Sequence, residues 1–362
     1  MARSPLPTST ASDDADIAEA LAEQVRRSSA ERRPLRVVGG DSKAFYGRPT
    51  QGDALEVFRH RGVIAYEPTE LVITARGGTP VAEIEALLAR HGQMLAFEPP
   101  VFTPASTIGG VVAAGLSGPR RPFAGAVRDC MLGARILDGR GRSLRLGGTV
   151  FKNVAGFDGF RLMAGALGCL GALLEVSLRL TPQPRRELSL SFEQDWPAAR
   201  ARITALMRRP TPLSGAWCDG ARLHLRLSGP EAAVAAAARE LGGEESPPSL
   251  WDDVRHMRLG LLAAPRLWRL SVPQAADLPG LDGRWLWDWG GAQRWLVTEA
   301  PAAAIRAAAA VAGGHATLFR GHVAGEQVFT PLPGPLMALH RRLKAAFDPL
   351  GVLNPGRMYE DL

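Results

Sequence analysis

Glycine-rich turns, each following a short apolar stretch, are the dominant feature of the first half of this 362-residue chain. The strand-like run Leu35–Val38 ends in Gly39-Gly40-Asp41-Ser42-Lys43, and residues 107–118 contain four more glycines. Because glycine has no Cβ, such turns expose backbone N–H groups that can form an anion-binding nest. For any single glycine, a simple tight turn is an equally good explanation. Three glycine-rich turns with lysines nearby, however, favour a site for the diphosphate of a dinucleotide.

Lysine is rare in this chain, and its positions are informative. Of the 43 lysines and arginines, only Lys43, Lys152 and Lys344 are lysine. Two of the three stand in glycine-rich loops, where a compact point charge fits and a planar guanidinium does not. No G-x-x-x-x-G-K-[ST] segment is present, and no G-x-G-x-x-G opens a strand–helix unit. The P-loop and Rossmann interpretations therefore lose their main support.

Composition excludes several classes of protein. The net charge is +7 and the pI is near 10, but the basic residues are spread along the chain, which argues against nucleic-acid binding. Cys130, Cys169 and Cys218 lie far apart in sequence, so we expect neither disulfides nor a metal site, and the three should be small buried hydrophobes in a cytoplasmic protein. No apolar run is long enough to cross a membrane. Residues 1–14 resemble a disordered leader rather than a signal peptide.

The first half predicts a mixed helix and strand domain over residues 15–184. We expect a helix at 15–28, strands at 35–38 and 71–75, and a helix capped by Thr79 that begins at Pro80 and ends at Gly92. Residues 107–118 predict a short helix whose N-terminus lies open. A hairpin over 133–146, a loop at 152–158, a helical stretch at 159–167 and a buried strand at 172–180 follow.

The character of the sequence changes at Thr181-Pro-Gln-Pro184, where we place a domain boundary. Residues 185–333 alternate strands and helices in two loosely similar copies, which predicts a smaller α+β domain with an antiparallel sheet and helices on one face. Residues 334–362 contain a final helix at 335–347. The rigid segment from Asp348 to Gly356 should then return to the first domain.

A resemblance becomes specific when the motifs are taken in order. They are Gly39-Gly40-Asp-Ser-Lys43, Ala105-Ser-Thr-Ile-Gly-Gly110, Lys152-Asn-Val-Ala-Gly-Phe-Asp158, Gly168-Cys-Leu-Gly171 and Asn354-Pro-Gly356. This order resembles the vanillyl-alcohol-oxidase-like, or PCMH-type, two-part FAD-binding fold. Three further segments, Pro68–Arg76, Gly118–Pro122 and Asp288–Gly291 with Arg294-Trp295, resemble the E subunits of bacterial glycolate oxidases. The likeness runs from about Leu35 to Tyr359.

The resemblance implies a set of FAD-binding residues. The first loop and the second would hold the diphosphate, through Gly39, Gly40, Asp41, Ser42, Lys43, Thr107, Gly109, Gly110, Ser117 and Gly118. Lys152, Asn153, Gly156 and Asp158 would line the flavin side of the cleft, and Gly171, Leu174 and Asn354 would complete it. Ala166 stands where many relatives have a hydroxyl. The first loop has no His or Cys, so the resemblance implies a non-covalent FAD.

Candidate catalytic residues are fewer. Oxidation of a 2-hydroxy acid needs a base and a cation for the carboxylate, for which His315, Arg294 and Arg357 are candidates. Each has an alternative role: His315 in starting a strand, and Arg294 as a buried or interfacial arginine stacked on Trp289 or Trp295. The histidine-rich metal site of catalytic relatives has no counterpart here, so we expect no metal.

The resemblance also implies partners. They are a catalytic D-type flavoprotein and an iron–sulfur F-type subunit, with attachment to the membrane only through the complex. On this hypothesis the chain supports electron transfer or assembly in a glycolate oxidase. A self-sufficient 2-hydroxy-acid dehydrogenase and a flavin-free scaffold are the alternatives.

Overall fold

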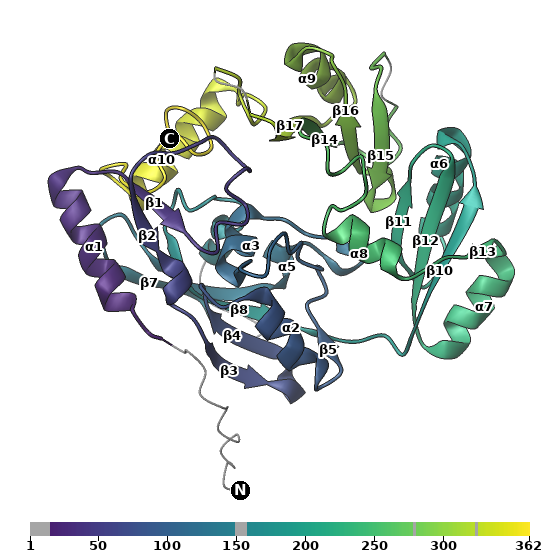
Figure 1. Cartoon of the computed structure of the whole chain (residues 1–362), viewed down its shortest axis with the longest axis horizontal. Helices are drawn as coiled ribbons and strands as arrows, with labels where there is room; N and C mark the ends of the chain where they lie inside the picture. The colour runs from purple at the N-terminus through teal and green to yellow at the C-terminus, as the bar shows by residue number, and fades with distance from the viewer. Residues whose placement is uncertain (1–14, 149–157, 278–279, 323–324) are drawn as a thin grey trace, which may run out of the picture.

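The computed structural model describes residues 15–148, 158–277, 280–322 and 325–362. Its two main sheets form from separate stretches of the chain, a five-stranded sheet from residues 63–179 and an eight-stranded sheet from residues 186–320 (Figure 1). Neighbouring strands are antiparallel in both sheets, and helices accompany each of them. The α+β class predicted from the sequence is therefore confirmed.

The first body contains the five-stranded sheet in the order β3-β4-β8-β6-β7 and a separate parallel pair, β1 with β2. Strand β8 lies at the centre of the sheet and is buried almost along its whole length, as its continuous apolar sequence predicts. In chain order the elements are α1 (Ala18–Glu31), β1 (Leu35–Val38), β2 (Asp53–Glu56), β3 (Val63–Glu67), β4 (Val72–Arg76), α2 (Val81–Ala89), β5 (Gln93–Met94), α3 (Ile108–Ala114), α4 (Arg121–Ala124), α5 (Val127–Cys130), β6 (Met131–Leu137), β7 (Ser143–Gly147), β8 (Ala172–Arg179) and β9 (Thr181–Pro182).

The start of helix α2 differs from the prediction by one residue. The helix begins at Val81, Pro80 occupies the N-cap position, and no side chain caps the helix. The Thr79 hydroxyl instead donates to the carbonyl of Arg76 at 2.7 Å and accepts from the N–H of Gly62 at 2.9 Å. Thr79 therefore fastens a turn beside the helix. Gly92, at φ +61°, is the predicted left-handed residue beyond the helix end.

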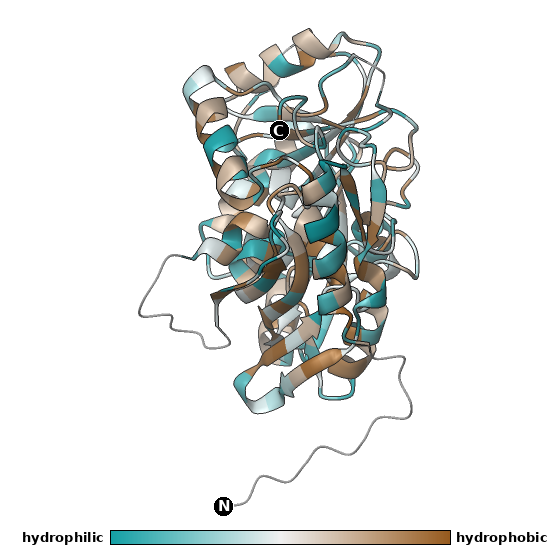
Figure 2. Ribbon diagram, turned by 90° about the vertical axis from the view of Figure 1, so that its left-hand side faces the viewer, coloured by the Kyte–Doolittle hydropathy of each residue, from teal (hydrophilic) through white to brown (hydrophobic). Residues whose placement is uncertain are grey.

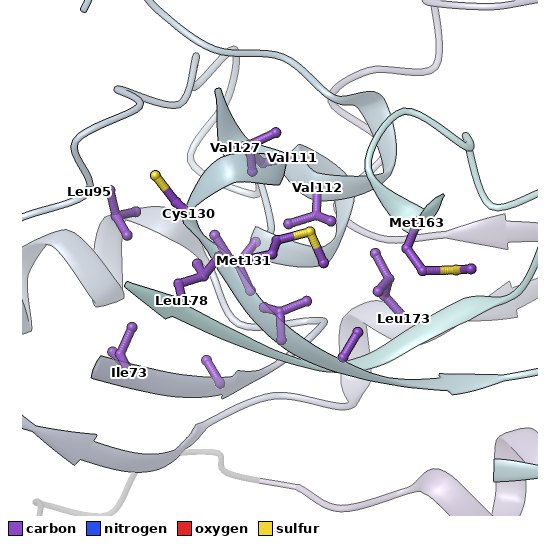
Figure 3. Packing of buried hydrophobic residues seen from close by; sticks show 14 of the residues in the cluster. Ile73, Leu95, Val111, Val112, Val127, Cys130, Met131, Met163, Leu173 and Leu178 are labelled. Atoms are coloured by element: carbon purple, nitrogen blue, oxygen red, sulfur yellow. The ribbon is translucent and has the colours of Figure 1, made fainter. Parts of the chain in front are cut away.

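Helix α3 rests on the first sheet through a continuous apolar core. Val111 and Val112 of the helix contact the cluster that contains Met131 of β6 and Leu173 of β8, with Met163 closing its side (Figure 3). These side chains are almost completely buried, so the helix has a fixed position over the sheet. The N-terminus of α3, and the loops around it, are thus held on a rigid support.

The second body is an eight-stranded antiparallel sheet in the order β13-β10-β12-β11-β15-β16-β14-β17. Helices α6, α7 and α9 cover one face, while the short helix α8 packs on the other, facing the first body through Trp251 and Val254. The prediction of helices on one face only is therefore wrong for α8. The elements are β10 (Arg186–Glu193), α6 (Trp196–Met207), β11 (Leu213–Cys218), β12 (Arg222–Gly229), α7 (Glu231–Leu241), β13 (Glu244–Glu245), α8 (Ser249–Arg255), β14 (Leu267–Ser271), β15 (Arg284–Asp288), β16 (Gln293–Val297), α9 (Ala302–Val311) and β17 (His315–Arg320).

Hydrophobic residues gather on the strands and on the inward sides of the helices, and hydrophilic residues lie on the outer helix surfaces (Figure 2). The three cysteines are buried in three different apolar clusters, with no disulfide among them. Burial raises the pKa of the Cys169 and Cys218 thiols to about 11. Their predicted identity as small buried hydrophobes agrees with these surroundings.

The last segment of the chain returns to the first body. Helix α10 (Gly334–Phe347) packs Leu343 and Phe347 against the core of the five-stranded sheet. Beyond it, the N–H of Leu35 donates to the carbonyl of Val352, and the N–H of Asn354 donates to the carbonyl of Leu35. The end of the described chain therefore lies against the strand that leads into the first glycine-rich loop.

Candidate functional site

A cavity of about 270 Å³ lies between the first glycine-rich loop and helix α3. The loop that follows β1, the start and end of α3, and the C-terminal segment form its walls. The lining residues are Arg36, Val37, Gly39, Gly40, Asp41, Ser42, Lys43, Ala44, Pro49, Thr50, Thr107, Gly110, Ala113, Ala114, Leu167, Asn354 and Arg357. Eight of the predicted cofactor-binding residues are thus brought together, from three distant parts of the sequence.

The first loop approaches the second so closely that only glycine fits. A Cβ on Gly40 would lie 1.5 Å from the carbonyl oxygen of Ala105, and a Cβ on Gly39 would lie 2.6 Å from the Thr107 hydroxyl. Both contacts are far shorter than van der Waals distance, and the first is with backbone. The two glycines therefore serve a close backbone approach that shapes the cavity wall.

The loop that lines this cavity has backbone donors that no described protein acceptor uses. Across the described residues, the N–H groups of Gly40, Asp41, Ser42 and Lys43 donate to no protein acceptor. The first turn of α3 is different. There Ile108 N donates to Thr79 O, Gly109 N to Gly77 O, and Gly110 N to the Thr107 hydroxyl at 3.2 Å. The predicted open helix N-terminus is therefore wrong, and the free donors belong to the first loop.

Lys43 is a partly buried ammonium with little protein to satisfy it. Its Nζ donates to the Ser42 hydroxyl at 3.3 Å and lies 5.6 Å from the centre of the Phe102 ring. Within the described ranges, no carboxylate forms an ion pair with it. Burial lowers the pKa of Lys43 from 10.5 to about 8. A desolvated cation beside free N–H groups fits an anion such as a diphosphate.

Two residues from the C-terminal segment hold the loop in place. Arg357 donates to the carbonyls of Tyr46 at 2.7 Å, Arg48 at 2.9 Å and Ala44 at 3.0 Å. Asn354 accepts from Val37 N at 2.8 Å and donates to Leu167 O at 2.6 Å. Because both side chains bond to backbone groups on the cavity wall, they fix its shape.

A second, smaller cavity of about 70 Å³ continues the first on the side of β8. Gly109 and Gly171, both predicted, line it, together with Gly77 and Gly168, which the prediction did not include. Leu174 does not line it and is fully buried in the core beside α1. The two cavities share Gly39, Thr107, Gly110 and Asn354, so they form one extended cleft over α3.

Thr50 is the clearest residue that sequence reasoning missed. It lines the first cavity, and its Oγ1 is buried without a hydrogen-bond partner in the described part of the chain. A buried hydroxyl without a partner is costly, so a bound polar group is the natural acceptor or donor for it. The signal was weak in sequence, since Pro49-Thr50 lies in an irregular segment between β1 and β2.

The remaining predicted cofactor residues lie elsewhere. Ser117 and Gly118 line a separate space of about 20 Å³ that faces the second body, where the Ser117 hydroxyl accepts from Val127 N and Gly118 O accepts from Trp289 Nε1. Asp158 is exposed and pairs with Arg161 at 3.0 Å. Lys152, Asn153 and Gly156 lie outside the described residues, as does the predicted leader at 1–14.

The three candidate catalytic residues do not come together. Arg357 clamps the first loop, and His315 is an exposed residue at the start of β17 that lines neither of these two cavities. Arg294 stacks on Trp287 at 4.2 Å, rather than on Trp289 or Trp295 as predicted. It lies on the helix-covered face of the second sheet, whereas Trp295 lies on the face toward the first body.

Two other arginines lie nearer the contact between the bodies. Arg269 donates to the Tyr46 hydroxyl at 2.9 Å and lines the small space beside Gly118. Arg121 stacks on Trp289 at 4.2 Å, and burial lowers its pKa. In sequence, neither stands out from the many arginines of the chain.

The described residues form neither a metal-ligand cluster nor a helix that could span a membrane. No three side chains among His, Cys, Asp and Glu gather closely enough there to hold a metal ion. Likewise, none of the helices in those ranges combines the length and apolar character that a membrane crossing requires.

Comparison with known proteins agrees with the geometry of the cleft. The FAD binding domain family matches residues 15–147. Glycolate oxidase subunit GlcE of Escherichia coli is 48% identical over 350 residues, which cover 96% of this chain and 99% of that protein. Glycolate oxidase subunit GlcD of Bacillus subtilis is 31% identical over 144 residues, or 39% of this chain and 30% of that protein.

Solved structures extend the likeness to the fold as a whole. An alkyldihydroxyacetonephosphate synthase matches with a TM-score of 0.65 over 93% of this chain and 75% of its own, at 14% identity. That likeness concerns the fold alone. The near-complete match to GlcE, together with the FAD binding domain match over the loops described above, gives the conclusion: the chain belongs to the GlcE family of glycolate oxidase subunits, FAD-dependent oxidoreductases.

Proposed function

We propose that this chain binds FAD non-covalently as one subunit of a glycolate oxidase that converts glycolate to glyoxylate. In this proposal it supports electron transfer or assembly with two partners, a catalytic D-type flavoprotein and an iron–sulfur F-type subunit. One observation carries the FAD part of the proposal. The first loop combines free backbone N–H groups with a partly buried Lys43, and among the described residues neither has a carboxylate partner.

The residues of the cleft fit the diphosphate of FAD. The N–H groups of Gly40 to Lys43 would donate to its oxygens, the Lys43 ammonium would neutralise charge, and the Thr50 hydroxyl would gain a partner. Asn354 and Arg357 would act as positioning residues, since their hydrogen bonds go to the loop backbone. The described residues that line the two cavities include no His, Cys or Tyr, the side chains that most often tether a flavin, which favours a non-covalent cofactor.

When bound, FAD supplies hydride or electron acceptance. What this chain itself adds is binding and orientation. The candidate base His315 and the candidate carboxylate-binding Arg294 do not line the cleft, since both lie on other parts of the second body. This separation supports a role within a complex over self-sufficient turnover of a 2-hydroxy acid. The relationship to GlcE and the partial relationship to GlcD point in the same direction.

Purification separates the three candidate roles. The chain should be isolated alone and as part of its complex, and reduction of a dye by glycolate should be followed in both. We expect bound flavin in the isolated chain, with turnover only in the complex. Turnover by the isolated chain at the rate of the complex would overturn the supporting role. A colourless chain that does not take up FAD would favour the flavin-free scaffold.

Gly40→Ala tests the cleft itself. The added Cβ would collide with the Ala105 carbonyl, so the first loop must move and FAD uptake should be lost. Gly334→Ala is a matched control, because nothing lies within 4 Å of a Cβ at the start of α10. Flavin absorbance per chain after gel filtration measures both. Equal flavin content in the two variants would contradict this placement of the cofactor.

A further inference from the structure

The middle of the second sheet is left uncovered on its helix-bearing face. Helices α6 and α7 pack over β10, β11 and β12, and α9 packs over β14 and β17, at the two ends of the sheet (Figure 1). Strands β15 and β16 lie between these groups. A cavity of about 310 Å³ occupies this position, on the face opposite the first body.

Tryptophan rings form the walls of this cavity. Trp285 and Trp287 are two positions apart on β15, so both point to the same face of the sheet. Trp196, at the start of α6, faces them. The Trp196 and Trp287 rings are 4.5 Å apart between centroids, at 31° to each other. Large rigid rings around a space of a few hundred Å³ are typical of a site for a small ligand with a flat apolar body.

Arg294 supplies a positive charge on the cavity wall. It is opposite Trp287 in the register of β15 and β16, has only 1% of its surface exposed, and lies 4.2 Å from the Trp287 ring. Its Nε donates to Gly291 O at 3.0 Å and its Nη2 to Ala276 O. Among the described residues, no carboxylate forms an ion pair with Arg294. In the same part of the chain, no acceptor of any kind bonds to its Nη1.

A second cation stands at the rim. Arg200, one turn along α6 from Trp196, pairs with the exposed carboxylate of Asp277. The cavity wall therefore carries two guanidinium groups and one carboxylate, and that carboxylate pairs only with Arg200 at the exposed rim. The cavity therefore has excess positive charge, with the deeper charge uncompensated. A buried unpaired cation is costly, and an anionic ligand removes that cost.

We infer that this cavity binds a small planar carboxylate, an aromatic or otherwise conjugated acid. Its ring would lie among the three tryptophans, and its carboxylate against Arg294 and Arg200. A cationic ligand would be repelled by the two arginines. A neutral ligand of the same shape would leave the Arg294 charge unmatched. This site is separate from the FAD cleft, since none of its lining residues lines either FAD-side cavity.

Naphthoate is a suitable probe, with naphthamide as its neutral equivalent. Titration into the purified intact chain, followed by tryptophan fluorescence and calorimetry, should give saturable binding of naphthoate. Naphthamide should bind at least about tenfold more weakly, because charge-assisted bonds to arginine are lost. Equal affinities for the acid and the amide would overturn the proposal.

Variants locate the probe. Arg200→Gln is a surface change on α6 and should weaken naphthoate severalfold, while Arg209→Gln, an exposed arginine paired with Glu240, should leave it unchanged. Trp287→Phe should weaken naphthoate binding more than Arg200→Gln does. Lys43→Met, in the FAD cleft, should have no effect. If Lys43→Met abolishes naphthoate binding, or FAD displaces the probe, the acid occupies the other site and the inference is wrong.

NMR gives a readout that does not depend on affinity. Indole N–H signals, assigned by Trp→Phe substitution, should shift for Trp196, Trp285 and Trp287 on addition of naphthoate. The signal of Trp251, on the opposite side of the sheet, should stay in place. Shifts confined to Trp251 or its neighbours would contradict this location.

Discussion

Two lysines in the first body, the buried Lys344 and the partly buried Lys43, have opposite surroundings. Lys344 of α10 is 9% exposed, and its Nζ donates to Asp348 Oδ2 at 2.7 Å, Leu353 O at 2.7 Å and Cys169 O at 2.8 Å. Lys43 has the Ser42 hydroxyl at 3.3 Å and the face of Phe102. An ammonium has three donors. All three donors of Lys344 are used by the protein, whereas within the described residues Lys43 has only the long bond to the Ser42 hydroxyl.

This difference separates a structural lysine from the one that we propose binds the ligand. Three near-ideal acceptors stabilise the charge of Lys344 within the fold, so removing it should damage the fold. Lys43 contributes a desolvated charge that the protein does not compensate, so removing it should damage binding and spare the fold. Each prediction below tests one side of this contrast, from the largest expected effect to the smallest.

Lys344→Met should cost about 3–5 kcal/mol in the free energy of unfolding, because it leaves the fully buried Asp348 carboxylate without its cation. Urea unfolding followed by circular dichroism measures it. Lys344→Met combined with Asp348→Asn should recover part of the loss, since no unpaired charge then remains. A loss below about 1 kcal/mol for the single variant would mean that the buried pair is not a structural element.

Lys43→Met should lower FAD affinity by about ten- to a hundredfold, the range expected for a lost charge-assisted hydrogen bond. The apo protein should keep or gain stability, since an uncompensated buried charge has been removed. Titration of the apoprotein with FAD, paired with urea unfolding, measures both effects. Arg128→Met, an exposed arginine in the same body, is the control and should change neither.

Deprotonation of Lys43 should change the stability of the apo protein and its affinity for FAD in opposite directions as the pH rises. Its pKa is about 8 in the folded chain and 10.5 in the ordinary case, so between these values the unfolded chain holds the proton that the folded chain has released. Apo stability should therefore rise with pH across this window, by up to about 1.4 kcal/mol per pH unit. FAD affinity should fall over the same window as the ammonium is lost.

Lys43→Met identifies the source of that pH dependence. Subtracting the variant from the parent chain at each pH removes the contributions of other titrating groups. The difference should contain one transition, centred near pH 8 in the binding data. If the parent and the variant follow parallel curves, Lys43 is not the group responsible.

Thr107→Ala should give the smallest effect, a loss of about 1 kcal/mol in the free energy of unfolding, because the hydroxyl caps α3 by accepting from Gly110 N. FAD affinity should fall by less than it does in Lys43→Met. Asp195→Ala removes an equivalent cap from α6 in the second body and should cost a similar amount with FAD affinity intact. Thermal unfolding with and without FAD measures both variants.

Local patterns predicted much of this molecule. The strand Leu35–Val38, the hairpin that turns at 138–141 and the helix Glu231–Leu241 follow from apolar periodicity and turn residues, which act within a few positions. The sequence also placed Gly39 to Lys43 in the cleft, because an adjacent strand, glycine pair and rare lysine are a local signal.

Features that depend on distant partners could not be predicted. The N–H groups of α3 are taken by Gly77 and Thr79, and Arg294 pairs with Trp287 rather than Trp289 or Trp295 because of strand register. Thr50 is unusual only because of what surrounds it in space. In each case the decisive contact is made by backbone or side chains that the local sequence does not contain.

The bond between Val37 N and Asn354 has a consequence for how the protein is made. These residues are 317 positions apart, and both border the cleft. A contact between such distant residues closes a long loop of chain, and during synthesis the first loop leaves the ribosome long before its clamp. The cleft therefore completes late, and we expect cofactor loading to follow release of the finished chain.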